Sequence, residues 1–384
     1  MNIICAHWTR TTRKFIMPLL RALTSLGHTV RIFGSQPLDA LRNAEADLFL
    51  TTSTELKHAV QEDKEWLLEQ TGKPYVTIWF QTPLRNLSTL KKLTSPLHLA
   101  MFIPDSSDVA ELKNLGFRNV FLFPMSWWVD TNYFKPSPPF EQYQHEVAWD
   151  CTFSPLQAVL KKYRQQYPDG TTRGIIDNAL KVFTSRIGKY VSPFHFLART
   201  TELDIWSSEF QSLQDKLFFL QKSLEREHIL RMLITKGIPL HIYGGFSLDH
   251  NSKNYNHLVK APEGVFIHDY IDTFRELPKL YSSSRILLSR MMYPSGTHDR
   301  LFCAAALKGF VLSEWKDDAA EAFEPGKEII MYRDLHEMPE LIKYYLSHED
   351  ERQQLAEAAH KRFLSAHTPL HRAREFAETI KKLL

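Results

Sequence analysis

Short apolar runs of strand length alternate with amphipathic stretches through the first third of the chain. Leu19, Leu20 and Leu23 recur at helical spacing, and Gly27 follows as a stop signal. Because strands that are apolar throughout are buried on both faces, this alternation predicts a parallel sheet with helices on either side. The predicted strands are 2–7, 29–33, 47–51, 75–80, 97–103 and 120–123, and the predicted helices are 12–26, 55–70 and 107–115.

A proline-rich segment at 134–139 interrupts both the helical and the strand pattern, because proline neither continues a helix nor fits a central strand. We interpret it as a linker between two domains. After a predicted strand at 147–153, the chain lacks strand signals and has helical spacing from about 155 to 236. The alternation then returns, with strands predicted at 240–243, 265–268, 285–289 and 310–313, and helices at 274–282, 299–308, 339–346, 350–363 and 369–384.

The pattern therefore predicts an α/β protein with two domains. The first comprises residues 1–135, the second comprises 136–368 with its helical segment, and a last helix occupies 369–384. The length of 384 residues agrees with this division, because a single core rarely grows so large.

Charge and composition exclude several classes of function. Lys and Arg number 47 against 44 Asp and Glu, an excess too small for a nucleic-acid-binding protein. No apolar run reaches the roughly 20 residues that cross a bilayer, and the first residues lack the basic region of a secretory signal. We therefore expect a cytoplasmic protein. Basic residues on the last helix favour a solvated surface, with peripheral contact to an anionic membrane as the alternative.

The cysteines and the missing motifs also bear on chemistry. Cys5, Cys151 and Cys303 are far apart in the sequence and are expected to be reduced thiols, not a disulfide frame or a zinc site. The sequence has no HExxH, GxxxxGK[ST], GxSxG or CxxC motif, and its seventeen histidines show no ligand spacing. We predict no metal site.

The most informative segment joins the predicted strand 285–289 to the helix that begins near 299. Ligands of open parallel sheets bind beyond the carboxyl ends of strands. Gly296 allows a ligand to approach the backbone, Thr297 or Asp299 can cap the helix, and Arg300 adds a cation to its first turn. With Tyr293, these residues predict a diphosphate site. The alternative is an ordinary capped helix after a strand.

Two further segments could contribute to a nucleotide site. Gly244 and Gly245 follow the strand 240–243, where they could contact a phosphate or ribose or simply form a tight turn. Tyr270, after the strand 265–268, could stack on a nucleobase or pack in the core.

Two residues of the first domain are candidates for acid–base catalysis. His7 ends the first strand and titrates near neutral pH, although a histidine there can also be structural. Asp105 follows the strand 97–103 and can instead cap the next helix.

Several motifs of the second half resemble one enzyme family. The segment RLFCAAALKGFVL at 300–312 resembles the R-x-F-E-A-x-A-x-G-x-F-x-L stretch of the CgeB/YkvP-like glycosyltransferases, which are related to spore maturation proteins and to the wider GT-B group. Further similar segments follow in order, AFEPGKEI at 322–329, YYLSH at 344–348 and HT with HR between 367 and 372. The resemblance covers most of the chain except about 155–224.

The resemblance implies a GT-B fold, with two Rossmann-like domains facing a cleft and the last helix returning to the first domain. It implies a hexosyltransferase-like enzyme that moves a sugar from a UDP-, GDP- or TDP-linked donor to a hydroxyl of a glycan, protein or lipid, for example in a cell-envelope glycan. The donor is held mainly by the second domain, with no cofactor and no metal, because helix N-termini and basic side chains stabilise the leaving diphosphate.

One departure from the family leaves alternatives open. Cys303 stands where the family usually has a glutamate that holds the donor ribose, and a thiol is a weak hydrogen-bond partner. Asp299, Glu314 or Glu324 could take that role, the donor could differ, or activity could be lost. The rival functions are a non-catalytic GT-B scaffold that binds a sugar nucleotide or a partner protein, and a GT-B epimerase.

Overall fold

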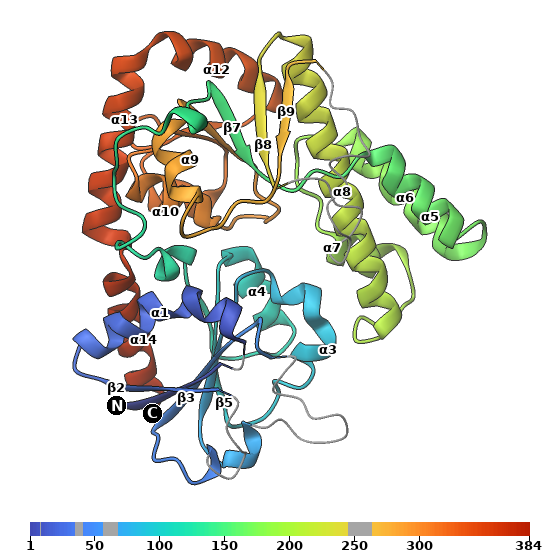
Figure 1. Ribbon diagram of the computed structural model, residues 1–384. Helices are drawn as coiled ribbons and strands as arrows, with labels where there is room; N and C mark the ends of the chain where they lie inside the picture. Colours follow the sequence, from blue (N-terminus) through green and yellow to red (C-terminus); the bar gives the residue numbers. More distant parts are fainter. Residues whose placement is uncertain (8, 35–40, 57–67, 245–262) are drawn as a thin grey trace. The chain divides into compact units, whose positions relative to one another are not determined.

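The computed structural model describes residues 1–7, 9–34, 41–56, 68–244 and 263–384. These residues form two compact units (Figure 1), each of which is described by itself. Unit 1 comprises Met1–Thr131, Ser295–Phe302 and Phe363–Leu384, and unit 2 comprises Asn132–Pro294 and Cys303–Arg362. The chain first passes from one unit to the other near the predicted linker. It also returns to unit 1 at 295–302, a segment that the sequence placed in the second domain.

Unit 1 contains a parallel six-stranded sheet in the order β2-β1-β3-β4-β5-β6. All six strands predicted in this part of the sequence are present. They are β1 (Asn2–Ala6), β2 (Thr29–Phe33), β3 (Leu48–Thr52), β4 (Tyr75–Ile78), β5 (His98–Ile103) and β6 (Val120–Leu122). Most of the helix predicted at 55–70 lies outside the described residues.

Helices near both ends of the chain pack together in unit 1. The helical elements of unit 1 include α1 (Arg10–Ser25), α3 (Leu87–Leu90), α4 (Ser106–Asn114), the short η3 (Met125–Trp128), η7 (Phe363–His367) and α14 (Pro369–Leu383). Helix α14 packs against α1 and η3. Its buried Phe376 lies against Phe102 of β5, with ring centroids 5.0 Å apart. The last helix therefore contributes to the core of the first sheet.

Unit 2 contains a second parallel six-stranded sheet in the order β12-β11-β10-β7-β8-β9 (Figure 1). Its strands are β7 (Val147–Asp150), β8 (Leu240–Tyr243), β9 (Val265–His268), β10 (Ile286–Ser289), β11 (Val311–Glu314) and β12 (Ile330–Tyr332). The short strand β12 was not predicted. One face of this sheet carries a large apolar core, which includes Leu240, Ile242, Leu288 and Leu312.

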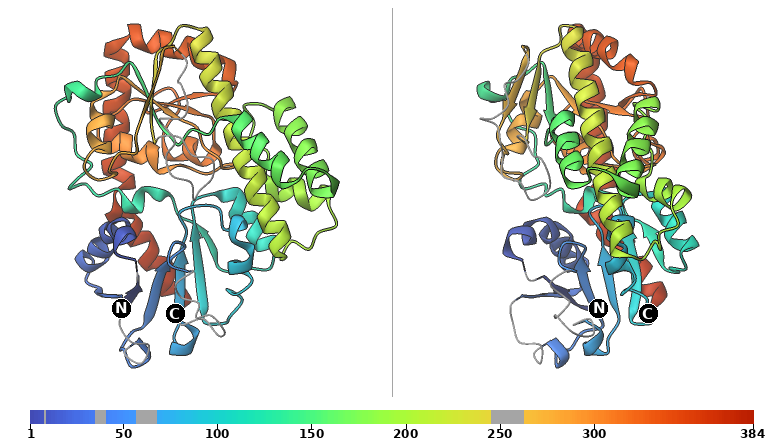
Figure 2. Two further views of the ribbon diagram at one scale, coloured as in Figure 1. Left: turned by 45° about the vertical axis from the view of Figure 1, so that its right-hand side comes forward. Right: turned by 90° about the vertical axis from the view of Figure 1, so that its right-hand side faces the viewer.

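Helices α5 (Leu156–Gln166), α6 (Gly170–Ser185), α7 (Pro193–Thr200) and α8 (Ser208–Thr235) fill the segment predicted to be helical. The first three pack along the 28-residue α8, as Figures 1 and 2 show. The remaining helices are α9 (Leu277–Ser283), α10 (Asp299–Ala306), α11 (Asp317–Ala322), α12 (Met338–Ser347) and α13 (Glu349–Arg362). Among the helices of the described ranges, none has both the length and the apolar character needed to span a bilayer.

Candidate functional site

A buried histidine and glutamate meet at the carboxyl edge of the first sheet. His7 follows β1 directly, and Glu55 lies three residues beyond β3, the neighbouring strand. Both side chains are fully buried, and His7 Nδ1 lies 3.6 Å from Glu55 Oε1. The backbone N–H of Thr9 donates to Glu55 Oε2 at 2.9 Å. The carboxylate thus faces the imidazole from a fixed position.

The surroundings of this pair favour a neutral imidazole. Burial lowers the pKa of His7, the positive charge of Arg13 lowers it further, and Glu55 opposes both effects. Burial and Glu55 together raise the pKa of the Cys5 thiol to about 12, so this thiol is inert. A neutral histidine that faces a buried carboxylate at 3.6 Å, a distance too long for a hydrogen bond, can act as a general base.

Asp105 has a different environment, because its carboxylate accepts backbone hydrogen bonds. It is the N-cap of α4, where it accepts from the Asp108 N–H at 3.0 Å. It also accepts from the N–H groups of Ser295 at 3.0 Å and Gly296 at 2.6 Å. A side chain at Gly296 would place its Cβ 2.6 Å from the Pro104 carbonyl oxygen. The glycine predicted for ligand approach is therefore required by the approach of this unit's own chain, and its N–H is already paired.

The residues after Gly296 form a small polar group at the start of α10. Thr297 is 1% exposed, and among the described residues its hydroxyl has no hydrogen-bond partner. His298 accepts from the Arg300 N–H at 3.3 Å and contacts the Arg300 guanidinium and Asp299. Burial raises the pKa of Asp299, but His298 and Arg300 outweigh it, so the pKa is lowered overall. The cap of this helix is thus His298, which the sequence did not predict.

The two predicted catalytic residues lie apart in unit 1. Their strands β1 and β5 are separated by β3 and β4. Three strand spacings of about 4.8 Å amount to about 14 Å. His7 and Asp105 therefore do not form one catalytic pair, whereas Asp105 and Gly296 are brought together.

A buried charge network occupies the carboxyl edge of the second sheet. Arg290 follows β10 and forms ion pairs with Glu225 of α8, at 2.5 Å, and with Glu314 at the end of β11. Lys316 Nζ lies 3.5 Å from Glu314, and all four side chains are nearly fully buried. Glu314 also accepts from the Met291 N–H at 2.6 Å.

This network places two cations where ligands of a parallel sheet bind. Buried charges are costly unless they are paired, so Glu225 and Glu314 stabilise Arg290 and Lys316 inside the unit. Burial also raises the pKa of nearby Tyr332. Both cations are thus fixed beyond the carboxyl ends of neighbouring strands, the edge at which ligands of parallel sheets bind.

The other predicted donor residues have varied surroundings. Gly244 has φ +135°, and a Cβ there would lie 2.8 Å from the carbonyl group of Cys151, so the chain itself requires this glycine. Gly245 lies outside the described residues. Tyr293 is buried, whereas Tyr270 is 67% exposed and does not pack in the core.

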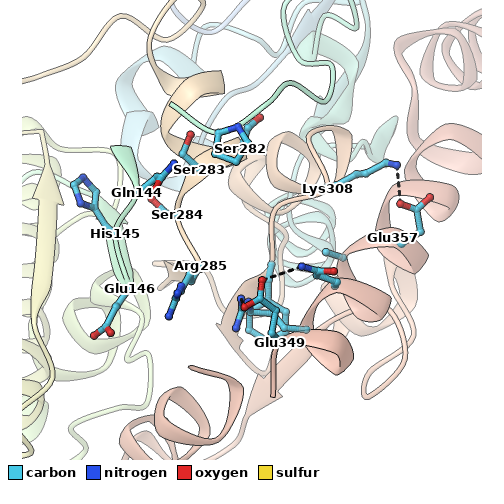
Figure 3. A pocket seen from close by; sticks show the side chains of 15 residues that line it. Gln144, His145, Glu146, Ser282, Ser283, Ser284, Arg285, Lys308, Glu349 and Glu357 are labelled. Carbon is cyan, nitrogen blue, oxygen red and sulfur yellow. Dashed lines mark hydrogen bonds and ion pairs between the residues drawn. The ribbon is translucent and has the colours of Figure 1, made fainter. Parts of the chain in front are cut away.

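A cavity of about 620 Å³ lies at the opposite, amino edge of the second sheet. Its lining includes residues one to three positions before the strands β7, β10 and β11, among them His145, Arg285 and Lys308 (Figure 3). Lys308 is paired with Glu357 at 2.7 Å. Since nucleotides bind α/β sheets at the carboxyl edge, this cavity is not a candidate donor site.

Sequence reasoning missed Glu55, Glu225, Arg290 and Lys316. Arg290 directly follows the predicted strand 285–289, and Lys316 lies three residues beyond the predicted strand 310–313, so their positions could have been noticed in the sequence. Glu55 and Glu225 become partners only in three dimensions. Of the carboxylates considered for the ribose, Glu314 is paired as described above, and Glu324 pairs with Lys327 at 2.5 Å. Cys303 itself is 1% exposed.

Comparisons with known proteins agree with this architecture. Residues 219–378 match the model of the family described as glycosyl transferase-like, a range that includes the whole buried network. No curated protein matches the sequence.

Solved structures match over the whole chain. The HepE protein of Anabaena in complex with UDP-glucose has a TM-score of 0.57 at 13% identity, covering 100% of both chains. Sucrose-phosphate synthase from Thermosynechococcus elongatus has a TM-score of 0.58 at 10% identity, covering 100% of this chain and 99% of the other. The DNA-modifying enzyme β-glucosyltransferase has a TM-score of 0.55 at 10% identity, covering 99% and 100%. The two parallel sheets thus have the GT-B fold of glycosyltransferases.

Proposed function

We propose that this protein is a glycosyltransferase, which moves a sugar from a nucleoside-diphosphate donor to a hydroxyl group of a glycan, protein or lipid. The observation that carries the proposal is the buried pair of cations, Arg290 and Lys316, at the carboxyl edge of the second sheet. The family match over 219–378 and the structural similarity to a protein bound to UDP-glucose support it.

The leaving diphosphate needs compensation for the negative charge that develops as the glycosidic bond breaks. We assign this role to Arg290 and Lys316, which Glu225 and Glu314 hold in place. Because protein cations fulfil the role, we propose that transfer needs no metal ion and no other cofactor.

Deprotonation of the acceptor hydroxyl requires a base. We assign it to His7, since its imidazole is neutral and Glu55 faces Nδ1, which leaves Nε2 to accept the proton. A substrate reaches this buried ring only if the residues over it move aside. Asp105 is the weaker candidate, because its carboxylate accepts three backbone hydrogen bonds.

Calorimetric titration with UDP-, GDP- and TDP-glucose in the presence of EDTA tests the proposal. We expect saturable binding of one of the three, with UDP the first choice given the ligand of the Anabaena protein. Absence of binding to all three would remove the proposal.

A matched pair of variants tests the site itself. Lys316→Met leaves the Arg290–Glu314 pair intact. It should weaken donor binding by about 10-fold or more, because that is the contribution of a typical hydrogen bond to a charged group. Lys308→Met is the control, since Lys308 lies at the amino edge of the same sheet. Equal affinity in both variants would show that the diphosphate binds elsewhere.

On the resemblance of the motifs between 300 and 372, we also propose that the chain is of the CgeB/YkvP-like subfamily, and we propose an envelope glycan as one acceptor to test. Cys303 favours the second candidate function, a scaffold that binds a sugar nucleotide or a partner without transfer. The two functions separate in one assay, because the scaffold binds donor but releases no nucleoside diphosphate. If Cys303→Glu then gains turnover, catalysis was lost at this position. If the natural protein already shows turnover and Cys303→Glu only lowers its stability, the result favours the enzyme.

A further inference from the structure

Three histidines gather on one face of the second sheet. His145 precedes β7, His241 lies in β8 and His268 ends β9, three neighbouring strands (Figure 1). Leu240 and Ile242, on either side of His241, belong to the apolar core. Because side chains alternate along a strand, His241 points to the opposite face, away from this core.

The ring nitrogens of these histidines lie close together. One nitrogen from each residue can be chosen so that all three lie within 4.8 Å of one another. His241 Nδ1 and His268 Nε2 are 3.0 Å apart, and the two ring planes are 13° from parallel. Two imidazole nitrogens bound to one tetrahedral Zn²⁺ are about 3.3 Å apart, as bond lengths of about 2.0 Å require. A small separation of this pair therefore suffices to admit an ion.

The third ring needs a larger adjustment. His145 stacks on His241 with ring centroids 3.6 Å apart and an interplanar angle of 14°. Since a metal ion lies near the plane of each imidazole that binds it, His145 must turn out of this stack. Its Nε2 lies 2.7 Å from the Tyr243 hydroxyl. When Nε2 donates to that hydroxyl, the lone pair of Nδ1 is available. Metal-binding histidines commonly have this arrangement, with one ring nitrogen on the metal and the other hydrogen-bonded to a neighbouring residue.

Protons compete weakly for these nitrogens near neutral pH. Burial, together with neighbouring imidazoles, lowers the pKa of His145 and His241 to about 4, and burial also lowers the pKa of His268. The three rings are therefore neutral at pH 7. In the hydrogen-bonded pair His241 and His268, the donor ring moves its proton to its other nitrogen when both rings bind an ion, so no proton is released.

We propose that His145, His241 and His268 bind a transition-metal ion of the zinc type, with a fourth position open to water. The ion cross-links the segments of three neighbouring strands and so stabilises unit 2. This role is independent of sugar transfer, for which the proposed charge compensation comes from Arg290 and Lys316.

Titration of Zn²⁺ into the metal-stripped, full-length chain tests the site, with calorimetry and thermal unfolding as readouts. We expect one strongly bound ion per chain, a higher Tm and, with Co²⁺ as a probe, the visible absorption of a tetrahedral site. His241→Ala and His268→Ala should each weaken Zn²⁺ binding by at least about 10- to 100-fold, because mutation of a residue that only hydrogen-bonds to a metal ligand already has an effect of this size. The control His336→Ala removes an exposed histidine of the same unit and should bind normally.

Three results would overturn the proposal. They are no saturable binding at millimolar Zn²⁺, normal affinity in both ligand variants, and equal loss in His336→Ala. If an alanine variant does not fold, His241→Gln keeps a polar side chain without an imidazole and replaces it. Donor binding is measured in the same samples with EDTA, so that failure of the metal site and failure of the proposed transferase remain distinguishable.

Discussion

At the scale of single residues, the decisive feature is how each ionisable group is paired. Asp105 and Glu314 have their carboxylate oxygens engaged by backbone N–H groups, and such carboxylates serve structure. His7 differs, since its imidazole is fully buried and its Nδ1 lies 3.6 Å from the Glu55 carboxylate, too far for a hydrogen bond. A buried polar group is costly when its hydrogen-bonding capacity is not met, so the burial of His7 calls for an explanation.

The base assignment predicts the behaviour of His7→Gln. Glutamine keeps a polar side chain of similar size but cannot accept the acceptor proton, so kcat should fall by about 10²- to 10⁴-fold. Donor affinity should stay unchanged, since the donor is assigned to unit 2. Steady-state kinetics and calorimetry measure the two quantities, and His28→Gln, another histidine of unit 1, is the control. A kcat within threefold of the natural protein would exclude His7 as the base.

The conformation of Gly244 leads to a second prediction at this scale. At φ +135°, a Cβ would lie 2.8 Å from the carbonyl carbon and oxygen of Cys151, and backbone atoms cannot yield as a side chain does. Gly244→Ala should therefore lower the free energy of unfolding by about 2 kcal/mol or more. In Gly237→Ala, with φ +68° and open space around the Cβ, the loss should be about 1 kcal/mol. Denaturant unfolding compares the two, and equal losses would contradict a steric role for Gly244.

These residues also show what the sequence could predict about the site. The preference of ligands for the carboxyl ends of strands drew attention to the loop before α10, but it could not reveal that Asp105 accepts hydrogen bonds from the amides of Ser295 and Gly296. The partners are about 190 positions apart. Pairing over such distances depends on the packing of the whole unit and leaves no local pattern.

At the scale of elements, the stack on β7, β8 and β9 joins polar side chains across strands. The rings of Tyr243 and His268 are parallel, with centroids 4.2 Å apart, and His241 stacks on Phe266 at 4.5 Å. The stack consists of imidazoles and aromatic rings, so its stability depends on the histidines remaining neutral. Protonation would place like charges next to one another.

This dependence predicts a loss of stability in mild acid. The unfolded chain takes up protons on histidine near pH 6.5, whereas folded His145 and His241 take them up only near pH 4. Between these values the unfolded state binds more protons, so the free energy of unfolding falls as the pH is lowered. Above about pH 7 the effect should vanish, because the histidines are then neutral in both states.

Thermal unfolding between pH 7.5 and 5 measures this effect in the presence of EDTA. The Tm of the natural protein should fall through this range, and the fall should be smaller in the double variant His145→Gln/His241→Gln. Replacement of the exposed His336 by Gln should leave the slope unchanged. Identical slopes in all three proteins would show that other groups control the acid response.

The sequence predicted most elements and failed at a few for identifiable reasons. Long helices such as α8 and the apolar strands carry their own periodicity, and the structure confirms them. Strand β12 has only three residues, Ile330–Tyr332, too few to show a period, and it exists because β11 offers it an edge. The six-residue α11 is likewise too short for a pattern.

At the scale of the whole molecule, each unit has its own sheet and core, but the units are not continuous in sequence. Unit 1 includes Ser295–Phe302 and Phe363–Leu384 besides the first 131 residues. Sequence patterns predict a linker at 134–139, where the periodicity is interrupted, and the first segment of unit 1 ends at Thr131. They miss the short return at 295–302, since a segment that crosses between units has no compositional signature. The return of the last helix was implied by the family resemblance and not by the pattern.

The contribution of α14 to unit 1 leads to a prediction about cooperativity. Phe376 is fully buried and packs against Phe102 and Phe123, with ring centroids 5.0 and 6.5 Å away. Removal of such a ring costs about 3–5 kcal/mol, so Phe376→Ala should strongly destabilise the first sheet even though it lies in the last helix. The control Leu364→Ala changes a half-exposed residue of η7 in the same unit and should have little effect.

Hydrogen exchange measured by mass spectrometry distinguishes the two units directly. In Phe376→Ala, peptides from β1, β3 and β5 should exchange faster by the factor that corresponds to the lost free energy, while peptides from β7, β8 and β10 keep their protection. This outcome follows if each core unfolds on its own. Equal acceleration in both sheets would mean that the chain unfolds as one cooperative body. Unchanged exchange in the first sheet would mean that α14 does not support its core.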